Sequence, residues 1–369
     1  MSPTTSRALD GLRRHAVGRA FFPPTTIERA VETFGFVQAD PIRAPARAQD
    51  LTLRHRVIGY RAGDLERLYP TLAIEEDFFV NYGFVPRAVQ GLMHPRSAMV
   101  RWSAQKRTRA EALLAFVRER GTVHPREVDA YFAHGTVTNY WGGASSATTH
   151  LLDGMHYRGM LRIARREGGV RIYAVREQLV ERLDVTERRA RLDALVDVIV
   201  AIYAPLPAQS LWGLVRRLAY AAPQWQADLK RAYQRATTRL ATAAVDGVHY
   251  YWPAGEESEG AVDDTVRLLA PFDPLVWDRR RFELFWGWRY RFEAYTPVAK
   301  RTLGYYALPL LWRDRVIGWA NVTSPGGLLD VQAQYVAGKP PRLRAFTRAL
   351  DEEIERMRVF LTPASSRPT

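Results

Sequence analysis

The clearest pattern of hydrophobic and polar positions along the chain lies between residues 108 and 175. The segment "AEALLAFVRERG" repeats its apolar residues at helical spacing and stops at Gly121, which predicts a helix and its end. A second, shorter helix is expected in "HPREVDAYF", where Pro125 occupies the first turn. A third is expected in "SSATTHLLDGMHYRGM", with Ser145 or Ser146 as its N-cap.

Alternating apolar and polar residues follow these helices. The segment "LRIARREGGVRIYAV" alternates on both sides of Glu167, Gly168 and Gly169, which predicts two strands joined by a tight turn. Three helices followed by a hairpin are the elements of a winged helix-turn-helix motif. The sequence therefore predicts such a motif in the middle of the chain.

Weaker copies of this pattern occur on either side of the central motif. Upstream, helices are expected in "TIERAVETFGF" and "RAQDLTLRHRV". Downstream, they are expected in "ERRARLDALVDVIVAIY", "AQSLWGLVRRL" and "QWQADLKRAYQRATTRLATA", and "GVHYYWPA" predicts a strand where a wing would lie. These copies indicate an approximate internal repeat of three winged helices.

The pattern changes near Val262. Short aromatic and β-branched runs are separated there by Pro and Gly, which predicts a β domain from "VRLLAPFDPLVWD", "RFEAYTP", "YYALPLLWRDRVIGWANV" and "LLDVQAQYV". An amphipathic helix is then expected in "RLRAFTRALDEEIERMRVFL", before the loose tail "TPASSRPT".

Together these patterns predict an α+β protein with three tandem winged helix-turn-helix motifs and a C-terminal β domain. The expected segments are residues 1–104 for the first winged-helix region, 105–185 for the second winged helix, 186–260 for the third, 261–340 for the β domain, and 341–369 for the C-terminal helix and tail.

The net charge adds an expectation about the partner. A formal charge of +14 and a pI near 10.2 favour a polyanion, and nucleic acid before a membrane, because no single helix has a lipid-facing pattern. The alternative is a compositional bias toward Arg, since Lys occurs only at positions 106, 230, 300 and 339. Charge alone does not decide between them.

Several classes of chemistry are excluded by composition. The chain has no Cys, so disulfides, iron-sulfur clusters and thiol catalysis are impossible, which fits a reducing cytoplasm. No signal peptide is expected, and the most apolar stretch, "LVDVIVAIYAPLPA", is too short and interrupted to span a bilayer. The His residues lack metal-helix spacing and no phosphate-binding loop is present, so we expect neither a metal nor a nucleotide cofactor.

One triplet, Gln38-Ala39-Asp40, has a distinctive local setting. Because Asp40 precedes Pro41, its backbone is pushed into an extended conformation. Side chains at i and i+2 of an extended segment point to the same side. Gln38 and Asp40 can therefore face one target together, although a helix-capping or turn role for Asp40 is the alternative.

Two similar triplets elsewhere serve as comparisons. Gln226-Ala227-Asp228 lies in a run of helix formers, and helical periodicity turns residues i and i+2 well away from each other. Gln332-Ala333-Gln334 is expected on a strand but contains no carboxylate. Neither copy combines a shared face with a carboxylate.

Basic residues near aromatic ones supply candidate DNA contacts. The run "FELFWGWRYRFEAY" interleaves arginines with aromatic rings, but most of these rings are expected in the core of the β domain. Better candidates are Arg279, Arg280 and Arg281, and a turn with Lys300 and Arg301 between two aromatic strands.

Two long motifs resemble a known family. "TFGFVQADPIRAPARAQDLTLRHRVIGY" resembles the opening of the winged-helix, crosslink-repair DNA glycosylases, the YcaQ-like and AlkZ-like proteins, and the segment from "APFDPLVWDRRRF" to "RVIGWANV" resembles their C-terminal β region. "NYWGGASSATTHLLDGMHYRGML" resembles their central winged helix. The resemblance covers most of residues 8 to 335.

The resemblance implies an active-site Gln-x-Asp or Gln-x-Gln motif on a basic concave surface for DNA. The motif falls on Gln38 and Asp40, the form more similar to the YcaQ branch, and Arg43, Arg47 and Arg54 beside it are expected to contact DNA. Two departures from the family pattern are the segment "EEDFFVNYGFVPRA", which lacks a His, and Gly318-Trp319 in place of a Gly-Arg pair.

The implied activity is hydrolysis of the N-glycosidic bond of N7-alkylated purines in damaged duplex DNA, including bulky adducts and possible interstrand crosslinks. No Lys lies near the motif in sequence, so we expect a monofunctional glycosylase that leaves an abasic site. We expect a monomer in the cytoplasm, associated with the nucleoid. The alternative function is a noncatalytic winged-helix transcription regulator that reads one operator.

Overall fold

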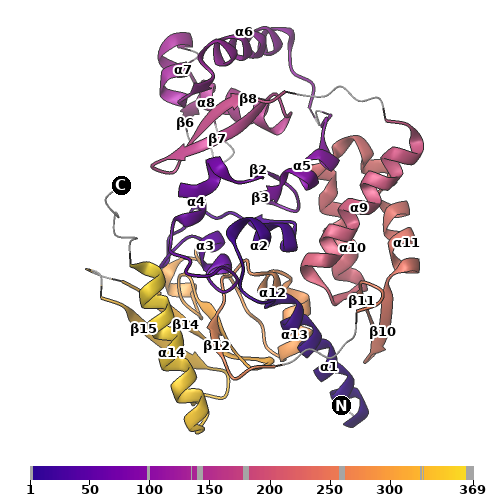
Figure 1. Ribbon diagram of the computed structural model, residues 1–369, viewed down its shortest axis with the longest axis vertical. Helices are drawn as coiled ribbons and strands as arrows, with labels where there is room; N and C mark the ends of the chain where they lie inside the picture. Colours follow the sequence, from indigo (N-terminus) through magenta and orange to yellow (C-terminus); the bar gives the residue numbers. More distant parts are fainter. Residues whose placement is uncertain are drawn as a thin grey trace. The chain divides into compact units, whose positions relative to one another are not determined.

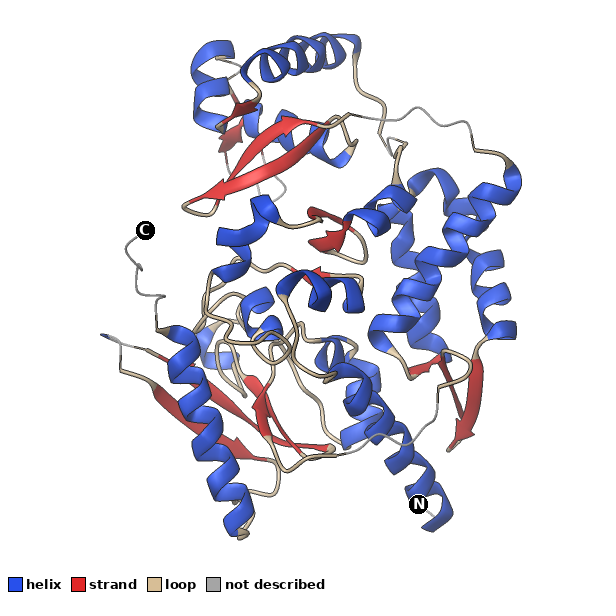
Figure 2. Cartoon of the chain, in the orientation of Figure 1, coloured by secondary structure: helices blue, strands red, loops and turns tan. Residues whose placement is uncertain are grey.

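The computed structural model describes residues 3–97, 100–133, 135–138, 144–177, 183–256, 262–324, 326 and 328–362. Figures 1 and 2 show its helices and strands. The chain folds into two compact units: the first unit comprises Met1–Leu65, Val196–Val215 and Tyr233–Thr369, and the second unit comprises Glu66–Leu195 and Arg216–Ala232. Within the described ranges, no helix is long and apolar enough to cross a membrane.

The second unit contains the elements that the sequence predicts between residues 108 and 175. They are α6 (Ala104–Arg120), α7 (Pro125–Phe132), α8 (Ala147–Tyr157), β7 (Leu161–Glu167) and β8 (Val170–Val175). The hydroxyl of Ser146 caps α8 by accepting the N–H of Thr149. A short strand, β4 (Thr122–Val123), adds to the hairpin in the order β4-β8-β7. These predicted elements are confirmed.

The remaining elements of this unit include a second hairpin. It is formed by β2 (Ile74–Phe78) and β3 (Tyr82–Pro86), which pair antiparallel between η1 (Tyr69–Thr71) and α5 (Arg87–Met93). A small hairpin of β5 (Thr136–Thr138) and β6 (Ala144–Ser146) precedes α8. Helix α4 (Asp64–Leu68) lies at the boundary between the two units in the sequence.

One predicted helix is interrupted. The run "QWQADLKRAYQRATTRLATA" forms a 3-10 helix, η2 (Pro223–Asp228), before α11 (Leu229–Arg239). The physical reason lies at Trp225, whose backbone leaves the helical region with φ −117° and ψ 15°. Gln226 and Asp228 therefore lie in a 3-10 helix rather than an α-helix. With about three residues per turn, a 3-10 helix likewise points residues i and i+2 in different directions.

The first unit begins with the helices that flank the Gln38 triplet. They are α1 (Pro3–Ala20), α2 (Ile27–Phe34) and α3 (Ala48–Leu53), with the short strand β1 (Val37–Gln38) between the last two. Further along the chain come α9 (Val185–Tyr203) and α10 (Ala208–Ala221), each of which is divided between the two units. The first unit also contains a sheet of β9 (Leu206–Pro207), β10 (Ala241–Val245) and β11 (Val248–Trp252). The helices expected here and the strand in "GVHYYWPA" are confirmed.

A four-stranded antiparallel sheet forms the C-terminal part of the first unit. Its order is β12-β13-β14-β15, from β12 (Val266–Leu268), β13 (Leu308–Trp312), β14 (Arg315–Thr323) and β15 (Asp330–Tyr335). Gly318 is required in β14, because a Cβ there would lie 2.0 Å from the carbonyl oxygen of Gln334. Helix α14 (Arg344–Leu361) lies beside the sheet (Figure 1). The N–H of Leu268 on β12 donates to Glu353 Oε1 on this helix at 2.8 Å.

Part of the predicted β domain is helical instead. Two short helices, α12 (Pro274–Trp277) and α13 (Arg279–Trp286), occupy the region of "FDPLVWDRRRFELFW". Each has an aspartate N-cap, Asp273 and Asp278, whose carboxylates accept backbone N–H groups of the first turn. "RFEAYTP" forms no strand, and Lys300 ends the 3-10 turn η3 (Val298–Lys300) rather than a β turn between two strands. The three-winged-helix arrangement and the five segment boundaries stay predictions.

Candidate active site

Gln38 ends strand β1 and is held by an indole from α12. Its side chain is buried, and Oε1 accepts a hydrogen bond from Nε1 of Trp277 at 2.7 Å. An indole N–H can only donate, so the amide oxygen of Gln38 must face Trp277. This contact leaves the amide nitrogen of Gln38 to donate elsewhere.

Helix α12, which carries Trp277, is itself fixed by a buried ion pair. Its N-cap, Asp273, accepts hydrogen bonds from Arg56 NH1 at 2.5 Å and NH2 at 3.2 Å, and both side chains are fully buried. The remaining hydrogen bonds of the guanidinium go to the carbonyl oxygens of Ala20 and Thr52. The orientation of Trp277 therefore depends on a buried cation that is paired with Asp273 and also hydrogen-bonded to two backbone carbonyls.

Asp40 is a buried carboxylate that makes no ion pair within the described residues. It is 8 % exposed; its Oδ1 accepts the N–H of Ile42 at 2.9 Å, and its own N–H donates to Gln49 Oε1 at 3.1 Å. Burial raises the pKa of the Asp40 carboxyl, against the lowering effect of the Ile42 hydrogen bond. The turn role weighed as an alternative thus uses one oxygen, and the second oxygen remains for chemistry.

Four aromatic rings pack together, three from the segment between α13 and β13 and one, Phe272, from just before α12. Phe292 packs edge-on against Tyr306 at 5.3 Å between ring centroids, and also contacts Phe272 and Tyr295 at 5.1 and 5.9 Å. Burial together with the negative charge of Asp40 raises the pKa of both Tyr295 and Tyr306. We call these four rings the aromatic wall.

The backbone beneath the aromatic wall is tied down at two points. The buried carboxylate of Glu293 accepts the N–H groups of Thr302 and Leu303, each at 2.8 Å, and that of Gly304 at 3.3 Å. Burial alone would raise the pKa of Glu293, but these hydrogen bonds lower it overall. Gly304 has φ +119°, a conformation that disfavours any residue with a Cβ.

The second attachment explains one departure from the family pattern. The side chains of Trp319 and Asn321, both on β14, donate hydrogen bonds to the carbonyl oxygen of Leu303 at 2.9 Å. Trp319 occupies the place where an Arg was expected by resemblance, and its indole supports the segment that carries Tyr306.

The structure brings together some of the predicted DNA contacts. Arg279 and Lys300 line one hollow of about 430 Å³, which is also lined by Arg289 and Arg291. Lys300 is exposed and Arg301 is half-buried, with its Nε donating to the carbonyl oxygen of Thr296 and its guanidinium over the ring of Tyr305. Of the remaining candidates, Arg43 and Arg280 are exposed and Arg47 is half-buried.

Two predicted DNA contacts are wrong because the side chains are buried. Arg281 is 1 % exposed and donates to the carbonyl oxygens of Tyr203 and Pro274. The side chain of Arg54 is 3 % exposed and pairs with Glu353. Both guanidinium groups bind partners inside the first unit. The sequence alone does not reveal which carbonyls and carboxylates will lie around an arginine.

The comparison triplets behave as expected of surface positions. The carboxylate of Asp228 is 53 % exposed and forms a weak pair with Arg231 at 3.4 Å. Gln332 lies on β15 and donates to Asp330 at 2.9 Å. Neither copy has the burial of Gln38 and Asp40.

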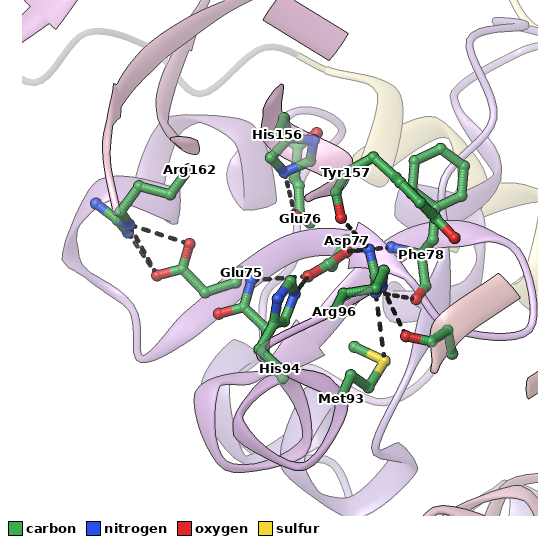
Figure 3. Close-up of polar contacts among 12 residues, drawn as sticks. Glu75, Glu76, Asp77, Phe78, Met93, His94, Arg96, His156, Tyr157 and Arg162 are labelled. Atoms are coloured by element: carbon green, nitrogen blue, oxygen red, sulfur yellow. Dashed lines mark hydrogen bonds and ion pairs between the residues drawn. The ribbon is translucent and has the colours of Figure 1, made fainter. Parts of the chain in front are cut away.

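A second polar cluster occupies the second unit, at the other departure from the family pattern (Figure 3). Asp77 accepts hydrogen bonds from Gln90 at 2.9 Å, from His94 at 2.8 Å and from Arg96 at 3.0 Å. Burial would raise the pKa of Asp77, but Arg96 and His94 hold it well below its usual range. Its neighbours are likewise paired, Glu75 with Arg162 and Glu76 with Arg166.

This cluster has the character of a structural core rather than a reactive site. Burial lowers the pKa of His94 to about 4, against the raising effect of Asp77, so the imidazole is neutral at neutral pH. Its carboxylates are already neutralised by arginines, which leaves them no free charge for a substrate. Across the described residues, no group of three or more His, Cys, Asp or Glu side chains could hold a metal ion.

Comparison with known proteins identifies the family of proteins to which this fold and its buried Gln-x-Asp motif belong. Residues 31–360 match the family described as "DNA glycosylase AlkZ-like", and the chain belongs to that family. The predicted enzyme class, a DNA glycosylase that acts in DNA repair, is confirmed, and the regulator alternative is set aside.

A solved structure shares this fold along almost the whole chain. It is the Streptomyces sahachiroi DNA glycosylase AlkZ, which is similar with a TM-score of 0.62 and 13% sequence identity, over 95% of this chain and 96% of that one. At this level of identity the likeness extends to the fold alone.

Proposed function

We propose that this protein is a monofunctional glycosylase that hydrolyses the N-glycosidic bond of N7-alkylated purines in duplex DNA, with Asp40 and Gln38 as its catalytic residues. The observation that carries the proposal is the buried carboxylate of Asp40, which has no cation beside it among the described residues. A buried charge without a partner is costly, and such groups are concentrated at functional sites.

The chemistry needs a negative charge at this position. An N7-alkylated purine is already cationic, so its bond to the sugar breaks toward an oxocarbenium-like centre and releases a neutral base. A nearby carboxylate stabilises the positive charge of the sugar and accepts a proton from the attacking water. Gln38, with its oxygen fixed by Trp277, can donate from its amide nitrogen to that water or to the substrate.

The aromatic wall supports a cationic base as the substrate. Aromatic faces attract cations, and the attraction strengthens where water is excluded. Tyr295 is 77 % exposed beside the half-buried ring of Phe292, which in turn packs against the buried Tyr306, so an aromatic face is available to a substrate. An exposed ring also suits bulky adducts and interstrand crosslinks, which a closed base-flipping pocket would reject.

The hollow lined by Arg279, Arg291 and Lys300 supports contact with the DNA backbone near the lesion. Its exposed cations are Arg289, Arg291 and Lys300, whereas the guanidinium of Arg279 donates to the carbonyl oxygens of Val276 and Pro271. We further propose that the protein binds damaged duplex DNA as a monomer and that it is associated with the nucleoid.

The test is single-turnover release of 7-methylguanine from duplex DNA by the Asp40→Asn variant. Asn can still accept the N–H of Ile42, so the turn is kept while the charge is lost. Release should slow by about 100- to 1000-fold, the scale of one lost electrostatic group, with DNA affinity and circular dichroism unchanged. Asp228→Asn, an exposed aspartate of the second triplet, should change release by less than about twofold.

Two outcomes would contradict this proposal. Equal release by Asp40→Asn and the wild type would remove Asp40 from the mechanism. A covalent protein–DNA adduct trapped by borohydride would indicate a Schiff base, and Lys300, on the same segment as the aromatic wall, would then be the first lysine to replace.

A further inference from the structure

The backbone of Asp40 is held by a second glutamine, Gln49 on α3. The N–H of Asp40 donates to Gln49 Oε1 at 3.1 Å. Since a backbone N–H can only donate, the atom of Gln49 that faces it is the amide oxygen. Gln49 is 6 % exposed, which places this hydrogen bond inside the first unit and away from bulk water.

The helix that carries Gln49 is firmly fixed in the first unit. Every residue of α3 is buried. The residue after Gln49 is Asp50, whose Oδ1 accepts hydrogen bonds from the hydroxyl of Tyr60 at 2.6 Å and from the N–H of Gly63 at 3.2 Å. The acceptor for the N–H of Asp40 is therefore presented from a rigid element.

The contact with Gln49 restricts Asp40 on the side that its other contacts leave open. A peptide bond is planar, so an anchored N–H fixes the plane of the peptide before Asp40. Pro41 restricts the backbone after Asp40, and the N–H of Ile42 holds Oδ1 at 2.9 Å. Together these three restraints set the direction of the remaining carboxylate oxygen, Oδ2. Catalytic groups lose much of their effect when they are misplaced by as little as about 1 Å.

We propose that Gln49 is a positioning residue for base release, and that its amide oxygen holds the Asp40 carboxylate in the orientation that the reaction requires. This inference rests on the proposed function. It also gives a reason for a neutral acceptor at position 49. A carboxylate there would accept the same N–H, but its negative charge would oppose the ionisation of Asp40. The amide supplies the hydrogen bond without that charge.

Two substitutions separate the hydrogen bond from the charge. Gln49→Met keeps a side chain of similar length but loses the acceptor. Its single-turnover release of 7-methylguanine at saturating enzyme should slow by about tenfold, the value of one hydrogen bond, with unchanged DNA affinity. Gln49→Glu keeps the acceptor, so its rate at the alkaline end of the pH profile should stay within about threefold of the wild type.

Gln90→Met is the matched control. Gln90 in the second unit is also 6 % exposed and is also bonded to an aspartate, because its Nε2 donates to Asp77 Oδ2 at 2.9 Å. Gln90→Met and Gln49→Met each lose one buried hydrogen bond, so both should unfold at a lower temperature than the wild type. Gln90→Met should nevertheless keep its release rate within about twofold. A loss of stability alone then does not account for slower release by Gln49→Met.

The pH profile adds a readout that a purely structural role would not move. A negative charge beside Asp40 raises its pKa, so the acid limb of Gln49→Glu should lie about one pH unit above that of the wild type. Gln49→Met adds no charge and should keep the limb of the wild type. The phenols of Tyr295 and Tyr306, on which the charge of Asp40 acts, have raised pKa values and stay neutral at acidic pH, so they add no limb of their own.

The outcomes distinguish this inference from the proposed function. Unchanged release by Gln49→Met, or equal slowing of Gln49→Met and Gln49→Glu at every pH, would overturn the role of Gln49. If circular dichroism shows that Gln49→Met does not fold, Gln49→Glu decides: a rate near that of the wild type with a raised acid limb supports the role, and a slow rate at alkaline pH refutes it. In each of these cases slow release by Asp40→Asn leaves the proposed function intact. If Asp40→Asn is as active as the wild type, the proposed function itself has failed.

Discussion

Trp277 and Gln38 lie far apart in the sequence, yet the indole N–H of Trp277 donates to Gln38 Oε1 at 2.7 Å. The contact turns the amide oxygen of Gln38 toward Trp277 and leaves the amide nitrogen to donate elsewhere. It also connects the Gln-x-Asp motif to α12, and through Asp273 to the buried Arg56.

Replacement of Trp277 by Phe tests the role of this contact. The change removes the N–H and leaves an aromatic ring, so the amide of Gln38 can turn over and present its oxygen toward the water. Base release should slow by about tenfold, the value of one hydrogen bond. Single-turnover rates decide the matter, and Trp225→Phe, a buried tryptophan of the second unit, is the control that should keep its rate.

The acid limb of base release should be set by Asp40. The carboxylate is the active form, so the rate falls as pH drops through the folded-state pKa of Asp40. Burial raises this pKa, and the limb should therefore lie above the range of an exposed aspartate. Single-turnover rates across acidic pH, in the range where circular dichroism shows the folded protein, measure it. The residual rate of Asp40→Asn should show no such limb, and a limb that persists in that variant would assign it to another group.

Binding to undamaged duplex DNA should be mainly electrostatic. The affinity should fall linearly with salt on logarithmic axes, with a slope of about 0.9 for each phosphate neutralised. The double variant Lys300→Ala/Arg301→Ala should bind more weakly, with a shallower slope, and release base more slowly at limiting enzyme. The matched control is Lys339→Ala/Arg342→Ala, which makes the same charge change at exposed positions between β15 and α14. If the two double variants have the same DNA affinity, salt dependence and rate of base release, the η3 turn does not contact DNA.

The cluster around His94 should make stability depend on acidity. Unfolded histidine binds a proton near pH 6.5, whereas burial lowers the pKa of folded His94 to about 4. Unfolding therefore takes up a proton between these values, and the free energy of unfolding falls as pH drops through that window, by about 1.4 kcal/mol per pH unit for each such proton.

Denaturant titrations from pH 7 down to about pH 4.5 measure this effect. His94→Gln can still donate to Asp77 but binds no proton. The free energy of unfolding of this variant should therefore fall less steeply with decreasing pH, by the contribution of one proton. Part of the slope should remain, because burial also lowers the pKa of His55 and His156. His249→Gln, the same substitution at an exposed position, is the matched control.

Much of the secondary structure followed from local pattern. The helices and hairpin between residues 108 and 175 were predictable because their periodicity, caps and Gly turn all agree. The region of α12 and α13 was not, because short aromatic runs read equally well as strands or helices until the caps Asp273 and Asp278 are weighed. The sequence contains that signal in "FDP" and "WDR", where each aspartate directly precedes a helix.

The site shows the same division between local and distant information. Pro41 restricts the backbone of Asp40, its immediate neighbour, to an extended conformation. From this local effect one can expect the side chains of Gln38 and Asp40 to point to the same side of the chain. Trp277 and Tyr306 could not be chosen from a sequence with many aromatic residues, since their contacts depend on the folded chain. The same holds for Arg281, whose partners are backbone carbonyls that no sequence pattern marks.

The order in which the pieces of the site leave the ribosome has a consequence for the cell. Arg56 and Gln38 are made early, but Asp273 and Trp277 must be synthesised before Arg56 has its counter-charge and Gln38 its indole. A nascent chain that stalls earlier therefore carries the Gln-x-Asp motif without the frame that orients it. Biosynthesis thereby delays assembly of the site, and fragments produced by premature termination are expected to be inactive toward the genome.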